Sequence, residues 1–275
     1  MATGFIERTG EGIGLMLRAA VRRVLPIGVR QDLKRWLRWD QQVISDCEIL
    51  LDDVHPKLLL GWKNPRVAAR QDSTFAPILQ QMREGRPRED FQALAAAMRV
   101  TGAVDPLIVE VGCGSAWNAE VLTRLWSRTF RYIGMDYSPA MITLARQRDS
   151  RRPYFVGDAA ALPLQDHSCD ILLSGTVLMH LIGYHAAIRE SHRVARRWCI
   201  FHTVPVVTKR ATTILKKFAY GSPVAEVVFN ADEFPRLLDN CGLRLRDVLN
   251  SLPHEYLDQV VGERVIARTY VCEIV

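Results

Sequence analysis

Between about residues 91 and 204, short apolar runs alternate with stretches whose apolar positions recur at helical spacing. The runs have the length of β-strands, and the stretch 116–126 after the first run places Val121 and Leu125 on one face of a predicted helix. This alternation favours a parallel sheet with helices on both faces, an α/β doubly wound domain. The predicted strands are 107–111, 132–136, 154–156, 171–174 and 198–203.

The first 90 residues have a different pattern, which predicts a helical N-terminal extension. Apolar residues recur at helical spacing over 13–24 until Pro26 ends the run, and a second short helix is expected over 29–37. Residues 83–90 are charged and contain Gly and Pro, so we interpret them as a linker. The extension, or lid, would then precede a main domain over 91–275.

The pattern after residue 204 is less regular. Residues 205–230 mix basic and apolar positions, and we expect this segment to cap the acceptor side of the site. The Asn-Ala-Asp-Glu stretch 230–233 has the form of a capping box that opens a helix ending near Gly242. Strand-like runs at 243–249 and 265–274 complete the chain.

Composition adds limits to this picture. Hydrophobic residues make up 48% and charged residues 24%, as expected for a protein that buries a core. The net charge is +6, and residues 1–45 hold eight Arg and Lys against four Asp and Glu. The six cysteines show no CxxC pair and no metal-finger spacing, which predicts a reducing, cytoplasmic compartment and no metal site. Charges interrupt the apolar runs, so we expect no membrane span.

A Gly-rich turn follows the first predicted strand. Gly112 and Gly114 would let the backbone approach a ligand and aim free N–H groups at it. Glu110, two residues earlier, needs a partner if it is buried, and the ammonium of a methionine moiety suits it. Asp136 ends the second strand, where an acid accepts hydrogen bonds from ribose hydroxyls. Asp158 follows the third strand and can accept from an exocyclic amine such as that of adenine.

These motifs resemble those of the class I S-adenosylmethionine-dependent methyltransferases, especially the broad small-molecule group. The resemblance covers about residues 105–205 and implies S-adenosylmethionine as the cofactor. It also implies a seven-stranded, mostly parallel sheet with an antiparallel last strand. The matching stretches are 109–115 (VEVGCGS), 134–138 (GMDYS), 156–159 (VGDA), 162–171 (LPL to CDI) and 177–181 (VLMHL).

The resemblance also implies which residues bind the cofactor, with Tyr137 and Ala159 lining an adenine pocket. Two departures concern the local turns: Ala116 stands where many members have a third glycine, and no Pro-Gly-Gly turn precedes the fifth strand. Ala116 is small enough to keep the shape of the turn, so we expect cofactor binding to be retained. The predicted cofactor-binding residues are Glu110, Gly112, Cys113, Gly114, Asp136, Tyr137, Asp158, Ala159 and Ser174.

The predicted activity is transfer of the sulfonium methyl group by in-line displacement, for which alignment is the main requirement. A hydroxyl or amine acceptor can also need a base. His180 follows the fourth strand and His202 ends the fifth, at the sheet edge where ligands bind, so both are candidate bases. A packing role for either histidine stays open, as does the choice between O-, N- and C-methylation.

The acceptor is less well defined. The fourth strand ends in Ser-Gly-Thr (174–176), unlike the motif typical of nucleobase amino-methyltransferases, which argues against nucleic acid. Our hypothesis is a small-molecule, glycan or lipid-linked acceptor, with residues 13–39 contacting the inner membrane face. Alternatively, these helices cover the cofactor pocket. The oligomeric state is left open. The basic residues that suggest an anionic acceptor are Lys209, Arg210, Lys216 and Lys217.

Two other functions share part of the motif set. An NAD(P)-dependent oxidoreductase would have the Gly-rich turn and the acid after the second strand. The Gly157-Asp158 pair and the expected antiparallel last strand speak against it. A cofactor-binding scaffold without transfer activity is the second alternative.

Overall fold

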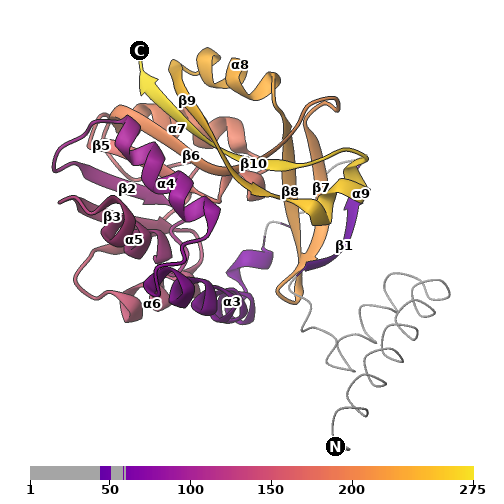
Figure 1. Cartoon of the computed structure of the whole chain (residues 1–275), viewed down its shortest axis with the longest axis horizontal. Coiled ribbons are helices and arrows are strands. Elements are labelled where there is room, and N and C mark those ends of the chain that lie inside the picture. The colour runs from indigo at the N-terminus through magenta and orange to yellow at the C-terminus, as the bar shows by residue number, and fades with distance from the viewer. Residues whose placement is uncertain (1–43, 51–57, 59) are drawn as a thin grey trace, which may run out of the picture. The chain divides into compact units, whose positions relative to one another are not determined.

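The fold is known from a computed structural model, which describes residues 44–50, 58 and 60–275 (Figure 1). The helices expected over 13–24 and 29–37 lie outside these residues. In chain order the elements are β1 (Ile44–Ile49), η3 (Gly61–Lys63), α3 (Pro65–Arg83), α4 (Glu89–Val100), β2 (Leu107–Val111), α5 (Trp117–Val121), η4 (Leu122–Trp126), β3 (Arg131–Asp136), α6 (Pro139–Arg148), β4 (Tyr154–Val156), β5 (Cys169–Gly175), η5 (Leu178–His180), α7 (Tyr184–Val194), β6 (Ala195–Val207), β7 (Thr213–Ala219), β8 (Ser222–Asn230), α8 (Glu233–Asn240), β9 (Leu243–Pro253), α9 (Glu255–Val261) and β10 (Ile266–Ile274).

Five parallel strands form the centre of the sheet, in the order β4-β3-β2-β5-β6. The strand order reverses at β2, which makes its carboxyl end the switch point where ligands bind in such sheets. β10 is antiparallel to β6, and β9 is antiparallel to β10. These seven strands confirm the predicted doubly wound sheet with an antiparallel last strand. β1, β7 and β8, which the sequence pattern did not predict, extend it to ten strands among the described residues.

The central strands are apolar because helices cover both faces of the sheet. Successive residues of β2 show this: Ile108 packs in a core with α4 and α5, whereas Val109 packs in a second core with α7 and α8. Both side chains are at most 1% exposed. The predicted crossover helix is present as α5 and the π-helical turn η4, whose Trp126 packs in the first core. No described helix is long and apolar enough to cross a membrane.

The described part of the first 90 residues is not helical throughout. β1 is a strand that pairs antiparallel with β7. α3 begins after Asn64, whose side chain accepts a hydrogen bond from the backbone N–H of Arg66 at 3.0 Å. Residues 84–88 join α3 to α4, so the predicted linker connects two helices of one compact unit, Ile44–Val275. A lid function for the residues before 90 stays a prediction.

Two helix starts were predicted from capping patterns. α6 begins at Pro139 as expected, but the Ser138 side chain makes no capping hydrogen bond. α8 begins after Asn230, whose side-chain oxygen accepts from the backbone N–H groups of Asp232 and Glu233 at 2.9 and 3.1 Å. The reciprocal bond of a capping box is absent from α8, because the Glu233 carboxylate accepts from Thr212 instead, at 2.8 Å.

The irregular segment 205–230 proves to be the end of β6 followed by a hairpin of β7 and β8. Tyr220 and Gly221 form its two-residue turn, and both have positive φ angles, which matches the twist of paired strands. β8 pairs with β6 only at Phe229 and Asn230, so the earlier part of β8 has no pairing to β6.

The short helix η5 forms a hydrogen bond with this part of β8. Nδ1 of His180 lies 3.2 Å from the carbonyl oxygen of Ala225, so η5 bonds to a strand edge that β6 leaves free. Helix η3 also packs against this part of β8. A Cβ atom built on Gly61 would lie 2.6 Å from the Pro223 carbonyl oxygen and 2.7 Å from a Val224 methyl carbon. Only glycine allows η3 to approach β8 this closely.

We expect Gly61→Ala to lower the free energy of unfolding by about 1–3 kcal/mol, because the added methyl group meets backbone and a buried side chain. Urea unfolding measures this change. Gly183→Ala is the matched control, since a Cβ there meets nothing within 4 Å. Equal stability of the two variants would contradict the close packing of η3 on β8.

Candidate active site

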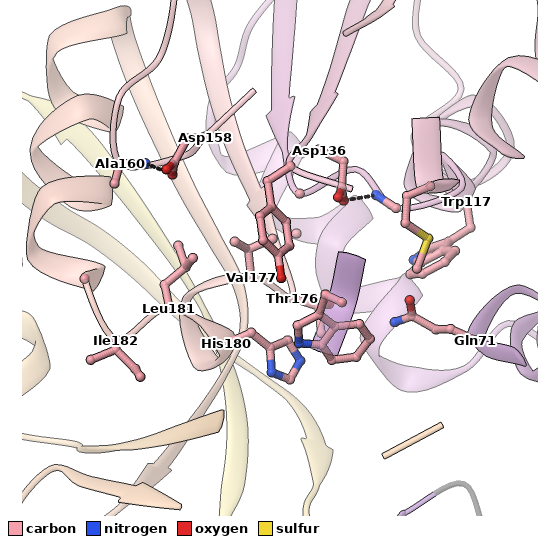
Figure 2. A pocket seen from close by; sticks show the side chains of 17 residues that line it. Gln71, Trp117, Asp136, Asp158, Ala160, Thr176, Val177, His180, Leu181 and Ile182 are labelled. Atoms are coloured by element: carbon pink, nitrogen blue, oxygen red, sulfur yellow. Dashed lines mark hydrogen bonds between the residues drawn. The ribbon is translucent and has the colours of Figure 1, made fainter. Parts of the chain in front are cut away.

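A cavity of about 260 Å³ opens at the carboxyl ends of β2, β3 and β5 (Figure 2). Gly112 and Gly114 come from the turn after β2, Asp136 and Tyr137 from the end of β3, and Asp158 from the segment after β4. A smaller cavity of about 50 Å³ shares Gly112, Tyr137 and Asp158 and adds Ala159 to its lining. The structure therefore brings six of the nine predicted cofactor residues to two cavities with shared walls.

The turn after β2 has a backbone that side chains disfavour. Gly112 and Gly114 have φ angles of +65° and +54°. A Cβ on Gly112 would lie 1.7 Å from a methyl carbon of Val177, so the turn also needs glycine for space. Ala116, at the position of the expected third glycine, has φ +65° and thus takes the left-handed conformation that a glycine would take at lower cost.

Asp136 ties this turn to the end of β3. One carboxylate oxygen accepts from the backbone N–H of Gly114 at 3.0 Å, and the other accepts from the N–H of Ser138 at 2.8 Å. Burial raises the pKa of Asp136 to about 6, although the two backbone N–H groups act in the opposite direction. Two of the roughly four lone-pair positions of the carboxylate remain for a ligand.

Glu110 lies behind the cavity wall and is not part of its lining. Its oxygens accept from the side-chain amide of Asn118, at 2.7 Å, and from the hydroxyl of Tyr132. A Cβ on Gly175 would lie 2.3 Å from the nearer oxygen. Burial raises the pKa of Glu110 to about 7, against the lowering effect of both hydrogen bonds. Its expected contact with a methionine ammonium stays a prediction.

Two other predicted cofactor residues, Cys113 and Ser174, are buried and do not line either cavity. The structure separates the two candidate bases. His180 lines the larger cavity, whereas His202 is buried in β6 with Nδ1 2.8 Å from the hydroxyl of Thr269. Burial lowers the pKa of each imidazole to about 4.

The cavity also has walls that the sequence motifs did not include. Trp62 and Gln71 come from η3 and α3, far ahead of the Gly-rich turn. Trp117, which directly follows Ala116 at the start of α5, stacks on Phe75 with ring centroids 4.2 Å apart. No local motif marks Trp62 or Gln71, because their place depends on packing between distant segments. Val177 and Leu181, which also line the cavity, belong to the matching stretch 177–181. The remaining lining residues that were not predicted are Met141, Ala160, Gly175, Thr176, Ile182 and Gly183.

Comparison with known proteins identifies the class of this domain. A family model described as a methyltransferase domain matches residues 109–201. Malonyl-[acyl-carrier protein] O-methyltransferase of Serratia marcescens is 33% identical over 90 residues, 32% of this chain and 34% of that protein. A probable S-adenosylmethionine-dependent methyltransferase of Mycolicibacterium smegmatis is 29% identical over 142 residues, 52% of this chain and 53% of that protein. The chain thus spans about a third to a half of the length of these curated relatives.

A solved structure shares the fold over most of the chain. It is the 1,6-didemethyltoxoflavin-N1-methyltransferase of Burkholderia thailandensis, with 1,6-didemethyltoxoflavin and S-adenosylhomocysteine bound. The TM-score is 0.52 and the identity 14%, covering 84% of this chain and 94% of that chain. At this identity the likeness concerns the fold.

A doubly wound sheet with a Gly-rich turn and acids at the next two strand ends defines a domain that binds a nucleoside-containing cofactor. With the family match, residues 109–201 are a class I S-adenosylmethionine-dependent methyltransferase domain, as the motifs predicted. S-adenosylmethionine is the cofactor of this class.

The buried Glu110 should make stability depend on pH. The folded protein keeps a proton on Glu110 up to about pH 7, whereas the unfolded chain releases it near 4.5. Stability therefore falls as the pH rises through this window. Since glutamine cannot ionise, Glu110→Gln should lose less free energy of unfolding between about pH 5 and pH 8.

Urea unfolding of wild type and variant at both pH values measures the difference. Asp136 contributes a similar fall in both proteins, because its pKa is also raised. Glu120→Gln is the control, since hydrogen bonding to Arg83 holds the pKa of Glu120 below its usual range. A fall for Glu110→Gln as large as that of wild type would contradict the raised pKa.

Proposed function

We propose that the protein transfers the methyl group of S-adenosylmethionine to a small-molecule acceptor. The observation that carries this proposal is the convergence of the Gly-rich turn, Asp136 and Asp158 on one cavity. These groups come from three successive strand ends, and each suits a different part of the cofactor. We call this side, with Gly112, Gly114, Asp136 and Asp158, the donor end.

The chemistry of the donor end fits S-adenosylmethionine. The backbone of Gly112 and Gly114 can lie against the methionine part, and the free lone pairs of Asp136 can accept from the ribose hydroxyls. The smaller cavity, with Ala159 among its apolar lining, suits the flat adenine ring. The bound cofactor supplies an electrophilic methyl group on a sulfonium, so the protein's part is to align an acceptor with it.

Two ion pairs weaken the case for an anionic acceptor. Lys216 pairs with Glu48 at 2.7 Å, and the buried Lys217 pairs with Glu226. Both lysines therefore have their charge matched by a carboxylate, and they give less support to an anionic acceptor than the sequence suggested. The Serratia marcescens and Burkholderia thailandensis proteins are named for different acceptors, so membership of this class does not determine the acceptor.

We expect S-adenosylhomocysteine to raise the melting temperature, because a ligand that binds only the folded state stabilises it by mass action. Asp136→Asn should weaken this binding roughly 10- to 100-fold, since charge-assisted hydrogen bonds are lost. Calorimetric titration measures the affinity, and the exposed Asp239 in α8 provides the control Asp239→Asn. Stabilisation by NAD or NADP and none by S-adenosylhomocysteine would indicate an oxidoreductase instead.

Methyl transfer itself is tested with S-adenosylmethionine labelled on the methyl group and fractions of cell extract. We expect one small-molecule fraction to acquire the label. Its mass and NMR spectrum then identify the acceptor and the atom that is methylated. Tight binding of S-adenosylhomocysteine without label in any fraction would favour a scaffold without transfer activity.

A further inference from the structure

The tautomer of His180 can be derived from its one hydrogen bond. Nδ1 lies 3.2 Å from the carbonyl oxygen of Ala225. A carbonyl oxygen only accepts, so Nδ1 carries the proton of the neutral ring. Nε2 then has a free lone pair, and no described residue bonds to it, while the side chain lines the cavity. Figure 2 shows His180 on the side of the cavity opposite Asp136 and Asp158.

Trp62 brings a hydrogen-bond donor to the same place. Its ring centroid lies 4.6 Å from that of His180, and both residues line the cavity. Nε1 of Trp62 is buried, and it has no partner among the described residues. Leaving a buried N–H without a partner costs about 1–3 kcal/mol, and Trp62 carries such a group while other atoms of the residue line the cavity.

The position of Trp62 is fixed by its neighbours on both sides. Its backbone N–H donates to the hydroxyl of Tyr137, at the donor end of the fold. The preceding Gly61 sits against β8 where no side chain would fit. On the other side, the Tyr220 ring lies 5.8 Å from the indole. Trp62 is therefore held between the end of β3 and the β7–β8 hairpin.

We propose that His180 and Trp62 form the acceptor end of the cavity and select the acceptor's chemistry. Nε2 of His180 accepts the proton of a hydroxyl or amine, and Nε1 of Trp62 donates to a neighbouring oxygen of the same molecule. The acceptor class is thus an O–H or N–H group next to a carbonyl, ether or hydroxyl oxygen. This inference rests on the proposed methyl transfer and specifies its substrate.

The transfer step balances with these groups alone. For a hydroxyl acceptor, the oxygen forms a bond to the methyl carbon as the carbon–sulfur bond breaks. The electron pair of the broken bond stays on sulfur, which gives S-adenosylhomocysteine. The hydroxyl proton passes to Nε2 of His180 and later to water. A methylated hydroxyl is a strongly acidic oxonium, so an imidazole with a pKa lowered to about 4 still takes its proton readily.

The charges behind His180 favour an acceptor group without net charge. Glu226 follows Ala225 in β8, and its carboxylate pairs with Lys217; the side chains are 0% and 4% exposed. Tyr256 also donates to Glu226 at 3.0 Å. Although burial alone would raise it, the pKa of Glu226 is held below its usual range by Lys217. The opposite charges of this ion pair offset each other, so the pair offers no excess charge to a charged acceptor.

His180→Asn tests the base. The asparagine amide can still donate to Ala225, but it has no nitrogen lone pair for a proton. We expect kcat to fall roughly 10²- to 10⁴-fold, with the affinity for S-adenosylhomocysteine unchanged. The assay uses the extract fraction that wild-type protein labels. His185→Asn, on the exposed side of α7, is the matched control and should transfer like wild type.

Trp62→Phe tests the donor, because phenylalanine keeps an aromatic ring and removes the N–H. We expect KM for the acceptor fraction to rise roughly tenfold with kcat little changed, as for the loss of one hydrogen bond in binding. This variant also keeps the proposal testable if His180→Asn does not fold, which thermal unfolding would reveal.

The structure of the labelled product gives an independent readout. We expect the new methyl group on an oxygen or nitrogen with a second oxygen on an adjacent atom or one atom further. Methylation on carbon or sulfur would overturn the proposal, as would wild-type turnover by folded His180→Asn. If wild-type protein binds S-adenosylhomocysteine but labels no fraction, the proposed function fails, and this inference fails with it.

Discussion

The buried carboxyl group of Glu110 is the interaction on which the order of the site depends. It receives hydrogen bonds from Asn118 in α5 and Tyr132 in β3, and it lies against Gly175 at the end of β5. Three elements around β2 are thereby held to one side chain that no water reaches. Since a buried acid without partners is costly, each of these contacts supports the others.

The Gly-rich turn follows directly from this arrangement. Once β2 and β3 are held together by Glu110 and Tyr132, the end of β3 brings Asp136 to the backbone N–H of Gly114 at 3.0 Å. Asp136 then shapes the turn and still has lone pairs for a ligand. Glu110 thus holds together the elements that carry the donor end, whereas Asp136 lines the cavity itself.

The sequence predicted the parts of the structure that depend on local pattern. The five parallel strands are short apolar runs between helices, and the donor-end residues lie within a few positions of those strand ends. The β7–β8 hairpin was not predicted, because the sequence pattern of Lys216 and Lys217 is that of solvent-exposed residues. Their carboxylate partners, Glu48 and Glu226, are known only from the structure. Trp62 was not predicted either, because its place at the cavity depends on contacts between residues far apart in the sequence. These are the packing of Gly61 on β8 and the hydrogen bond between the Trp62 backbone and Tyr137.

The limited pairing of β8 with β6 has a consequence for the two ends of the proposed site. The donor end is built from the central parallel strands, whereas the acceptor end relies on a hairpin that joins them at Phe229 and Asn230. Under the proposed function, a change in the length or sequence of that hairpin alters the acceptor end and leaves the central strands intact. The two proposed ends of the cavity can therefore change independently of each other.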